Sequence, residues 1–303
     1  MSRSYKATGI NLKAIPLGET DRLLTILTRE QGLVRAVAPG ARKHKSRLGG
    51  RSAQFVINEL LVIQGKQLDK VVQAETVQSF PGLATDLAKL TASQYLAELV
   101  LAQALSAQPQ EALFTLFVEH LERLAQTQPA GVLPGLCQGI FHLLALAGVA
   151  PTVHQCCVSQ TPVVPDLAQV NWRAGFSAIA GGVVSPDQLA TLGTAEAIAP
   201  RLRTAPGRYP GRGGPAPRKP SAGSRPTLIT AAEVALLQRL GESELLTVRS
   251  GPVAPTSADG AVTQALWSPI ERLLRDYAQY HFDRPIRSAA LLDTCFPVAV
   301  APT

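Results

Sequence analysis

The spacing of apolar residues changes at Pro81, and this change constrains the fold more than any other feature of the sequence. Before Pro81, short runs with period-two alternation are separated by turn-forming stretches such as PLGETD and GKQLD, which is typical of β-strands. After Pro81, apolar residues recur with the spacing of amphipathic helices. The sequence therefore predicts a β domain followed by a mainly helical one.

Five strands are expected in the first 80 residues, at 7–15, 21–28, 32–38, 55–64 and 70–78. So many strands in so short a segment suit a small closed barrel, because closure removes exposed sheet edges. A five-stranded barrel of this size is the usual format of an OB-fold. We therefore expect residues 1–80 to form an OB-fold barrel.

The rest of the chain is predicted to build one helical domain in two parts, residues 81–192 and 229–303. The apolar patterns indicate helices at 83–105, 110–126, 132–147, 230–240 and 266–282. The helix at 132–147 is almost wholly apolar and should lie at the centre of the bundle. Residues 148–190 show no regular period and are expected to be irregular.

Residues 193–228 consist almost entirely of Pro, Gly, Ser, Ala and Arg. Such a segment buries too little apolar area to offset the entropy of ordering it, so we expect a disordered linker. The segment is either a linker without further role or an auxiliary nucleic-acid tail. Its cations are Arg201, Arg203, Arg208, Arg212, Arg218, Lys219 and Arg225.

Charge is distributed unevenly along the chain. Residues 1–80 contain 13 Lys and Arg against 6 Asp and Glu, and residues 197–232 contain 7 cations and no acid, whereas the remainder has a deficit of seven. A basic domain of this kind is typical of a protein that binds a polyanion, most often nucleic acid or an acidic membrane surface.

The stretch APGARKHKSRLGG, residues 38–50, follows a predicted strand and concentrates the positive charge. We expect it to bind phosphates by counterion release, with glycines that let a ligand approach the backbone closely. The alternative is a solvated loop that only keeps the protein soluble. The predicted DNA contacts are Arg35, Arg42, Lys43, Lys45, Arg47 and Arg51.

Aromatic residues are scarce in the first 80 positions, where only Tyr5, Phe55 and Phe80 occur. Many proteins that bind single strands stack bases on aromatic rings. Phe55 and Phe80 are better explained as core and hinge residues. Binding is therefore predicted to depend on the nucleic-acid backbone more than on stacking.

Several motifs in a fixed order resemble the RecO family of bacterial recombination mediators. They are GETDRLLTILTREQGLVRAVAPGARKHKSRLGG, QFVINELLV, LLALAGVAP before HQC, FSAIAGGVVS and LLRDYAQYHFDRPIRS. The resemblance covers nearly the whole chain apart from residues 193–228. It implies an N-terminal OB-fold, binding of single- and double-stranded DNA, strand annealing, contact with the single-strand-binding protein, and RecA loading together with RecR.

The sequence departs from this family at a zinc site. Many members carry two C-x-x-C pairs, and the corresponding positions here are Cys156, Ser159, Ser185 and Gln188. One thiol cannot hold a structural zinc, which needs four ligands. We therefore expect a degenerate zinc-finger-like segment at 151–190 with no metal, held by packing of Trp172 and Phe176, and Cys157 as a small buried residue.

The resemblance also predicts a groove in the helical domain for the acidic, apolar C-terminal tail of a single-strand-binding protein. Candidate carboxylate partners are Arg123, Arg272 and Arg275, although each arginine is equally well explained as a solvated helix residue.

No arrangement of catalytic residues stands out, so we expect a protein that is not an enzyme and needs no cofactor. The five histidines are scattered, no GxxxxGK[ST] motif occurs, and Glu19 and Asp21 are interpreted as turn residues. The N-terminus shows no signal sequence and no uninterrupted apolar span follows, which predicts a cytoplasmic, nucleoid-associated protein without a membrane. The alternative function is an RNA-binding OB module in RNA processing or translation.

Overall fold

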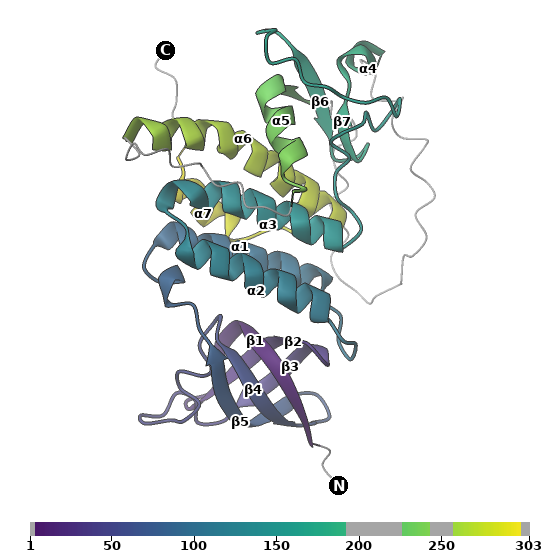
Figure 1. The fold of residues 1–303 in the computed structure, drawn as a ribbon. Helices are drawn as coiled ribbons and strands as arrows, with labels where there is room; N and C mark the ends of the chain where they lie inside the picture. Colours follow the sequence, from purple (N-terminus) through teal and green to yellow (C-terminus); the bar gives the residue numbers. More distant parts are fainter. Residues whose placement is uncertain (1–3, 192–225, 243–256, 298–303) are drawn as a thin grey trace. The chain divides into compact units, whose positions relative to one another are not determined.

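A computed structural model describes residues 4–191, 226–242 and 257–297, and structural statements refer to these ranges (Figure 1). The chain divides into two compact units, which are described separately. The first comprises Met1–Gly139 and Arg287–Cys295, and the second comprises Ile140–Ile286 and Phe296–Thr303.

The first unit begins with the predicted five-stranded closed barrel. Its strands are β1 (Ser4–Leu17), β2 (Asp21–Thr28), β3 (Gly32–Ala38), β4 (Ile57–Ile63) and β5 (Asp69–Gln78). Their order is β1-β2-β3-β5-β4, and β4 pairs with β1 to close the barrel. The long strand β1 pairs with β4 through Ser4–Ile10 and with β2 through Gly9–Leu17, and its register with β2 shifts between Asn11 and Lys13. The OB-fold prediction is confirmed.

The alternating side chains of these strands fill the barrel. Leu24 and Ile26 of β2, Leu60 of β4 and Val71 of β5 are at most 3% exposed. Each such side chain contributes about 1.5–3 kcal/mol through burial. The weakest seam is the parallel pair β3 and β5, in which only Ala36 and Val37 find partners.

Helices complete the first unit. They are α1 (Leu87–Gln103), α2 (Glu111–Gln126), the first half of α3 (Val132–Leu146) and α7 (Ala289–Cys295), with short 3-10 turns at Pro81–Leu83 and Pro129–Gly131. The Asp86 side chain caps α1. The Glu98 carboxylate of α1 accepts backbone N–H groups of Arg287 and Ser288, which ties the start of α7 to α1.

The barrel and the first helices belong to one compact unit. The Phe55 ring lies 6.3 Å from that of Phe117 on α2, and the Arg29 guanidinium lies 4.8 Å from the ring of Phe114. These contacts join the barrel to α2, and the division between the compact units falls within α3, after Gly139. Packing between elements, which local periodicity does not report, determines this boundary.

The second unit contains a small sheet that the sequence analysis missed. β6 (Arg173–Ser177) pairs with β7 (Gly182–Val184) and with β8 (Thr227–Thr230). The helices of this unit besides the end of α3 are α4 (Pro186–Thr191), α5 (Ala231–Arg239) and α6 (Ser257–Phe282). Residues 148–190 are therefore not wholly irregular. Thr227 and Leu228 belong to β8, so the predicted disordered linker 193–228 is wrong at its end. These strands have only three to five residues, and β6 and β8 lie far apart in the sequence, so the sequence shows little period-two alternation there.

The helix α3 is the most apolar helix of the described chain. By length and hydropathy alone, Pro129–Leu146 could cross a membrane, although Gln138 and His142 interrupt the apolar run. Of this window, 61% is buried inside the fold. α3 therefore has the burial of a core helix, as its pattern predicts.

Candidate nucleic-acid interface

The basic loop, residues 39–56 between β3 and β4, is built from consecutive turns. Backbone N–H groups of Lys43, Ser46 and Gly49 donate to the carbonyl three residues earlier, at 3.0–3.2 Å. Gly40 has φ +62°, a left-handed conformation that glycine adopts without strain. A β-carbon on Gly49 would lie 3.3 Å from the Ser46 carbonyl. These two glycines therefore serve the turns of the loop.

The first half of the loop is held by residues at the start of β2. The Asp21 carboxylate accepts the Gly40 N–H at 2.7 Å and the Thr20 hydroxyl at 2.8 Å. The Gly40 hydrogen bond, followed by that of Thr20, lowers the pKa of Asp21 below its ordinary value. Arg42 donates from its guanidinium to the Gly18 carbonyl. Asp21, interpreted from sequence as a turn residue, is thus an anchor of the basic loop.

Two buried asparagines hold the second half of the loop. Asn11 donates through Nδ2 to the carbonyls of Arg51 and Ala53 at 2.8 and 2.9 Å, and Asn58 donates to the same Arg51 carbonyl at 2.9 Å. Both side chains are fully buried. A polar amide in the middle of an apolar strand is the signal that could have identified them from sequence.

Arg22 is a further anchor that the sequence analysis missed. Its NH1 donates to the Gly49 carbonyl at 3.0 Å and to the Ser52 hydroxyl at 2.8 Å. This arginine is therefore used inside the domain to fix the loop. The shape of the basic loop is set from three strands before any ligand arrives.

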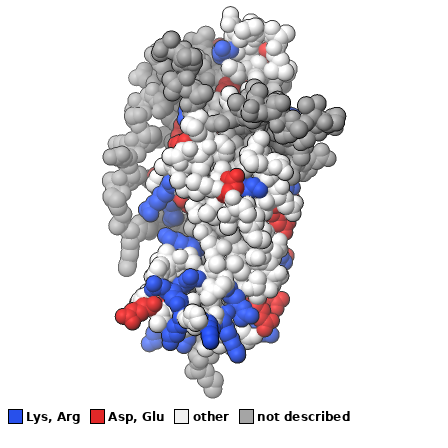
Figure 2. All heavy atoms as spheres, turned by 90° about the vertical axis from the view of Figure 1, so that its left-hand side faces the viewer, with Lys and Arg blue, Asp and Glu red and all other residues white. Residues whose placement is uncertain are grey.

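The cations predicted to bind DNA lie on the outside of this scaffold. Arg35 on β3 and Arg42, Lys43, Lys45 and Arg47 on the loop are exposed, whereas Arg51 is partly buried. None of the six forms an ion pair with another described residue. Figure 2 shows Lys and Arg gathered over the barrel, at the bottom of the view. The surface around the loop is thus positive and uncompensated.

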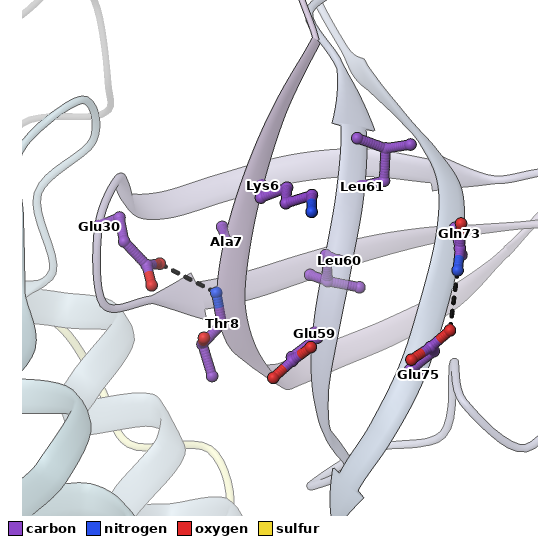
Figure 3. A pocket seen from close by; sticks show the side chains of 9 residues that line it. All are labelled: Lys6, Ala7, Thr8, Glu30, Glu59, Leu60, Leu61, Gln73 and Glu75. Atoms are coloured by element: carbon purple, nitrogen blue, oxygen red, sulfur yellow. Dashed lines mark hydrogen bonds between the residues drawn. The ribbon is translucent and has the colours of Figure 1, made fainter.

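Another part of the barrel wall carries the opposite charge. A pocket of about 360 Å³ on β1, β4 and β5 is lined by Glu30, Glu59 and Glu75, with Lys6 as its only cation (Figure 3). Glu59 and Glu75 are direct partners across β4 and β5. Carboxylates at this spacing repel phosphate. This wall is therefore a poorer surface for a polyanion than the side of the basic loop.

Aromatic rings are withdrawn from the barrel surface. Phe55 and Phe80 are 4% and 8% exposed, as expected of core residues. Tyr5 is partly buried and donates its hydroxyl to the Asp69 carboxylate at 2.5 Å. The arrangement favours contact with the nucleic-acid backbone over stacking.

The other predicted contacts are distributed as follows. Arg201, Arg203, Arg208, Arg212, Arg218, Lys219 and Arg225 lie outside the described residues. Arg123 belongs to the first unit and pairs with Glu119, whereas Arg272 and Arg275 lie on α6 in the second unit. Arg275 makes a two-point contact with the nearly buried Glu271, so its guanidinium is already engaged. Arg272 is exposed.

Two of the positions that the sequence analysis compared with zinc ligands, Ser159 and Ser185, lie close to the sulfur of a third, Cys156. The backbone N–H groups of Ser159 and Ser185 point at Cys156 Sγ, at 3.5 and 3.3 Å. Burial favours the neutral thiol, but these hydrogen bonds outweigh it and lower the pKa of Cys156 to about 7. Burial raises the pKa of the neighbouring Cys157 to about 11. A single sulfur faces two backbone donors where a metal would require further ligands.

These residues do not fit a structural zinc. No group of three or more His, Cys, Asp or Glu side chains suited to a metal occurs in the described part of the chain. The prediction that the protein binds no zinc awaits metal analysis. As predicted, Phe176 packs in the segment, with its ring 5.8 Å from that of Tyr277, whereas Trp172 is partly exposed and contributes less than predicted.

Comparison with known proteins agrees with this architecture. The family model described as "Recombination protein O N terminal" matches residues 1–80, and "Recombination protein O C terminal" matches residues 84–206. A protein named DNA repair protein RecO from Acaryochloris marina is 52% identical, covering 98% of this chain and 96% of its own length. Proteins of the same name from Nostoc sp. and Gloeothece citriformis are 46% and 48% identical, over 98% of this chain and 97% and 99% of theirs. The chain therefore belongs to the RecO family.

Proposed function

We propose that the protein is a non-enzymatic, DNA-binding recombination mediator that acts in the repair of double-strand breaks and gaps. The observation that carries the proposal is the basic loop, whose exposed cations stand on a framework fixed by Asp21, Arg22, Asn11 and Asn58. The names of its relatives place them in DNA repair. The site of action would be the cytoplasm, in association with the nucleoid.

The mechanism follows from charge. Each lysine or arginine that neutralises a phosphate releases a condensed counterion, which gives affinity without sequence preference. Two complementary strands repel each other, and a surface that neutralises both lowers the barrier to their pairing. The acidic wall around Glu59 and Glu75 keeps the strands on one side of the barrel.

Partners complete the proposal. With RecR, the protein would help to load RecA onto single-stranded DNA coated by the single-strand-binding protein. The acidic tail of that protein would bind the helical part of the chain. Arg272 is the best placed of the three candidate arginines, because it is exposed while Arg123 and Arg275 already pair with glutamates.

The decisive test removes the charges of the loop. We expect the variant Arg42→Ala/Lys43→Ala/Lys45→Ala/Arg47→Ala to bind single-stranded DNA more weakly. The slope of log affinity against log salt should fall by about 3, since each phosphate contact on a single strand contributes about 0.7. The measurement is a DNA titration by fluorescence anisotropy at several salt concentrations.

A matched control changes charge elsewhere on the barrel. Glu59→Gln/Glu75→Gln should leave the salt slope as it is, because these side chains do not contact phosphate in the proposal. If the loop variant kept the affinity and the slope of the wild type, the loop would be a solvated turn.

Strand annealing separates the DNA and RNA alternatives. We expect the wild type to accelerate pairing of complementary DNA oligonucleotides, also when they are coated with single-strand-binding protein. Failure to anneal, together with tight binding of structured RNA, would favour the RNA-binding OB module instead.

A further inference from the structure

A polar groove of about 480 Å³ lies along β3 on the barrel. It has a size typical of small-ligand sites, which span about 300–1,000 Å³. Its rim carries three glutamines, Gln31, Gln64 and Gln67, together with Arg35. No part of the sequence analysis pointed to this groove.

The groove exists because β5 leaves β3 early. Only Ala36 and Val37 of β3 pair with β5, at Asp69 and Lys70. The Gly32 end of β3 is instead covered by the connection between α1 and α2, where Leu33 N–H donates to the Leu105 carbonyl at 2.8 Å. The gap between this connection and the β4–β5 loop, residues 64–68, forms the groove.

The floor and one rim are fixed by internal hydrogen bonds. The Asp69 carboxylate accepts the Tyr5 hydroxyl at 2.5 Å and the Gly65 N–H at 3.0 Å, so both of its oxygens are engaged. Burial, followed by the contact with Asp69, raises the pKa of Tyr5, which keeps the hydroxyl protonated. A β-carbon on Gly65 would lie 1.9 Å from the Leu68 carbonyl, so the β4–β5 loop is tightly turned at this point.

The polar groups on the rim are available for a ligand. Gln31, Arg35, Gln64 and Gln67 are exposed, and within the described part of the chain their side chains have no hydrogen-bond or ion-pair partner. A glutamine amide offers two donors and one acceptor group, and it can turn to match either kind of atom. Such amides recognise the edge of an unpaired nucleobase, and a guanidinium plane can lie against its face.

We propose that this groove binds an unpaired nucleobase of the strand whose backbone lies on the basic loop. The inference rests on the proposed function and deepens it. Arg35 lies three residues before the end of β3, about 10 Å along an extended strand, so a strand bound on the loop reaches the groove within a few nucleotides. In a duplex the Watson–Crick edge of each base is occupied and its faces are stacked, so the base cannot turn into the groove, and the groove therefore favours single strands over duplex. Because the amides can turn, it does not select one base.

The experiment compares two single-stranded probes of equal length on the full-length protein, an ordinary mixed-sequence oligonucleotide and its abasic counterpart. The wild type should bind the ordinary oligonucleotide about tenfold more tightly, which corresponds to one or two hydrogen bonds. The variant Gln31→Ala/Gln64→Ala/Gln67→Ala should bind both probes equally, with the salt slope of the wild type. Gln73→Ala, which removes an exposed glutamine outside the groove, should keep the tenfold preference.

Equal affinity of the wild type for both probes, or a triple variant that still prefers the ordinary one, would overturn the proposal. Thermal unfolding of the triple variant at the wild-type temperature confirms that it is folded. Two measurements separate phosphate binding by the loop from base binding by the groove. A lower salt slope in the loop variant tests phosphate binding. The ratio of the affinities for the ordinary and the abasic oligonucleotide tests the groove. An unchanged slope in the loop variant would refute the proposed function while the probe ratio still reports on the groove.

Discussion

At the scale of single residues, the interface depends on side chains that do not contact the ligand. Asn11 and Asn58 are fully buried in apolar strands, where an unpaired amide would be costly, yet both donate to carbonyls of the basic loop. Arg22 and Asp21 fix the same loop from β2. Four residues thus order a loop whose own composition favours solvation.

The first prediction concerns this framework. Asn11→Ala leaves the Arg51 carbonyl with one donor fewer and the Ala53 carbonyl without its side-chain partner, so unfolding free energy should fall by about 1–3 kcal/mol. Affinity for DNA should fall as well, because the loop must then be ordered on binding. Hydrogen exchange of the loop amides and DNA titration measure the two effects. Gln73→Ala serves as the control, and equal exchange rates in wild type and Asn11→Ala would contradict the role of Asn11.

At the scale of elements, the segment 151–190 is held by backbone hydrogen bonds around Cys156. Cys156 N–H donates to the Thr161 carbonyl and Cys157 N–H to the Val183 carbonyl, so two separate turns still meet at the sulfur. The N–H groups of Ser159 and Ser185 add two hydrogen bonds to the Cys156 sulfur. The sheet of β6, β7 and β8 then closes the segment across the linker.

A pH dependence follows from this sulfur. The folded pKa of Cys156, about 7, lies below the 9.0 of an unperturbed thiol, so the native state loses its proton first and gains stability as pH rises from 7 to 9. The stability difference between wild type and Cys156→Ala should grow by on the order of 1 kcal/mol over this range. Denaturant unfolding at several pH values measures it.

Cys157→Ala is the matched control. Its folded pKa, about 11, lies above that of the free thiol, so its stabilising contribution is complete below pH 9 and declines only as pH rises toward 11. The difference between wild type and Cys157→Ala should stay flat between pH 7 and about 8.5. A Cys156→Ala difference that was also flat would show that the two N–H groups do not stabilise a thiolate.

At the scale of the whole molecule, charge is divided into a basic barrel segment, an acidic body and a basic linker. Residues 197–232, which include most of the linker, carry seven cations and no acid. A flexible polycation follows a phosphate backbone without fixed geometry. We therefore expect the linker to add to the affinity of the barrel loop.

The test changes charge without changing length. Replacing the seven cations between Arg201 and Arg225 by serine should lower both DNA affinity and salt slope, and the loss should add to that of the loop variant. The substitutions stop before Pro226, which directly precedes β8 and lies close to Gly175 of β6. If the slope of log DNA affinity against log salt did not change, the segment would be a linker without a role in DNA binding.

The sequence predicts the strands and helices of the fold better than the contacts that build the candidate site. The strands β2 and β3 begin and end where the sequence predicts, because alternation over seven or eight residues is a local property. The helices α1, α2 and α3 were likewise found. The pairing of β8 with β6, and the anchoring of the loop by Asn11, join residues far apart in sequence and leave no local period.

The sequence by itself determined the barrel, the helices, the positive charge of residues 38–51 and the absence of any C-x-x-C pair, because each depends on residue type and near spacing. Only the tertiary structure decided where the compact units divide and that a groove opens where β5 leaves β3. It also decided which cations are exposed and which, like Arg22, form hydrogen bonds inside the domain. These properties depend on contacts made after the chain has folded, and composition does not record such contacts.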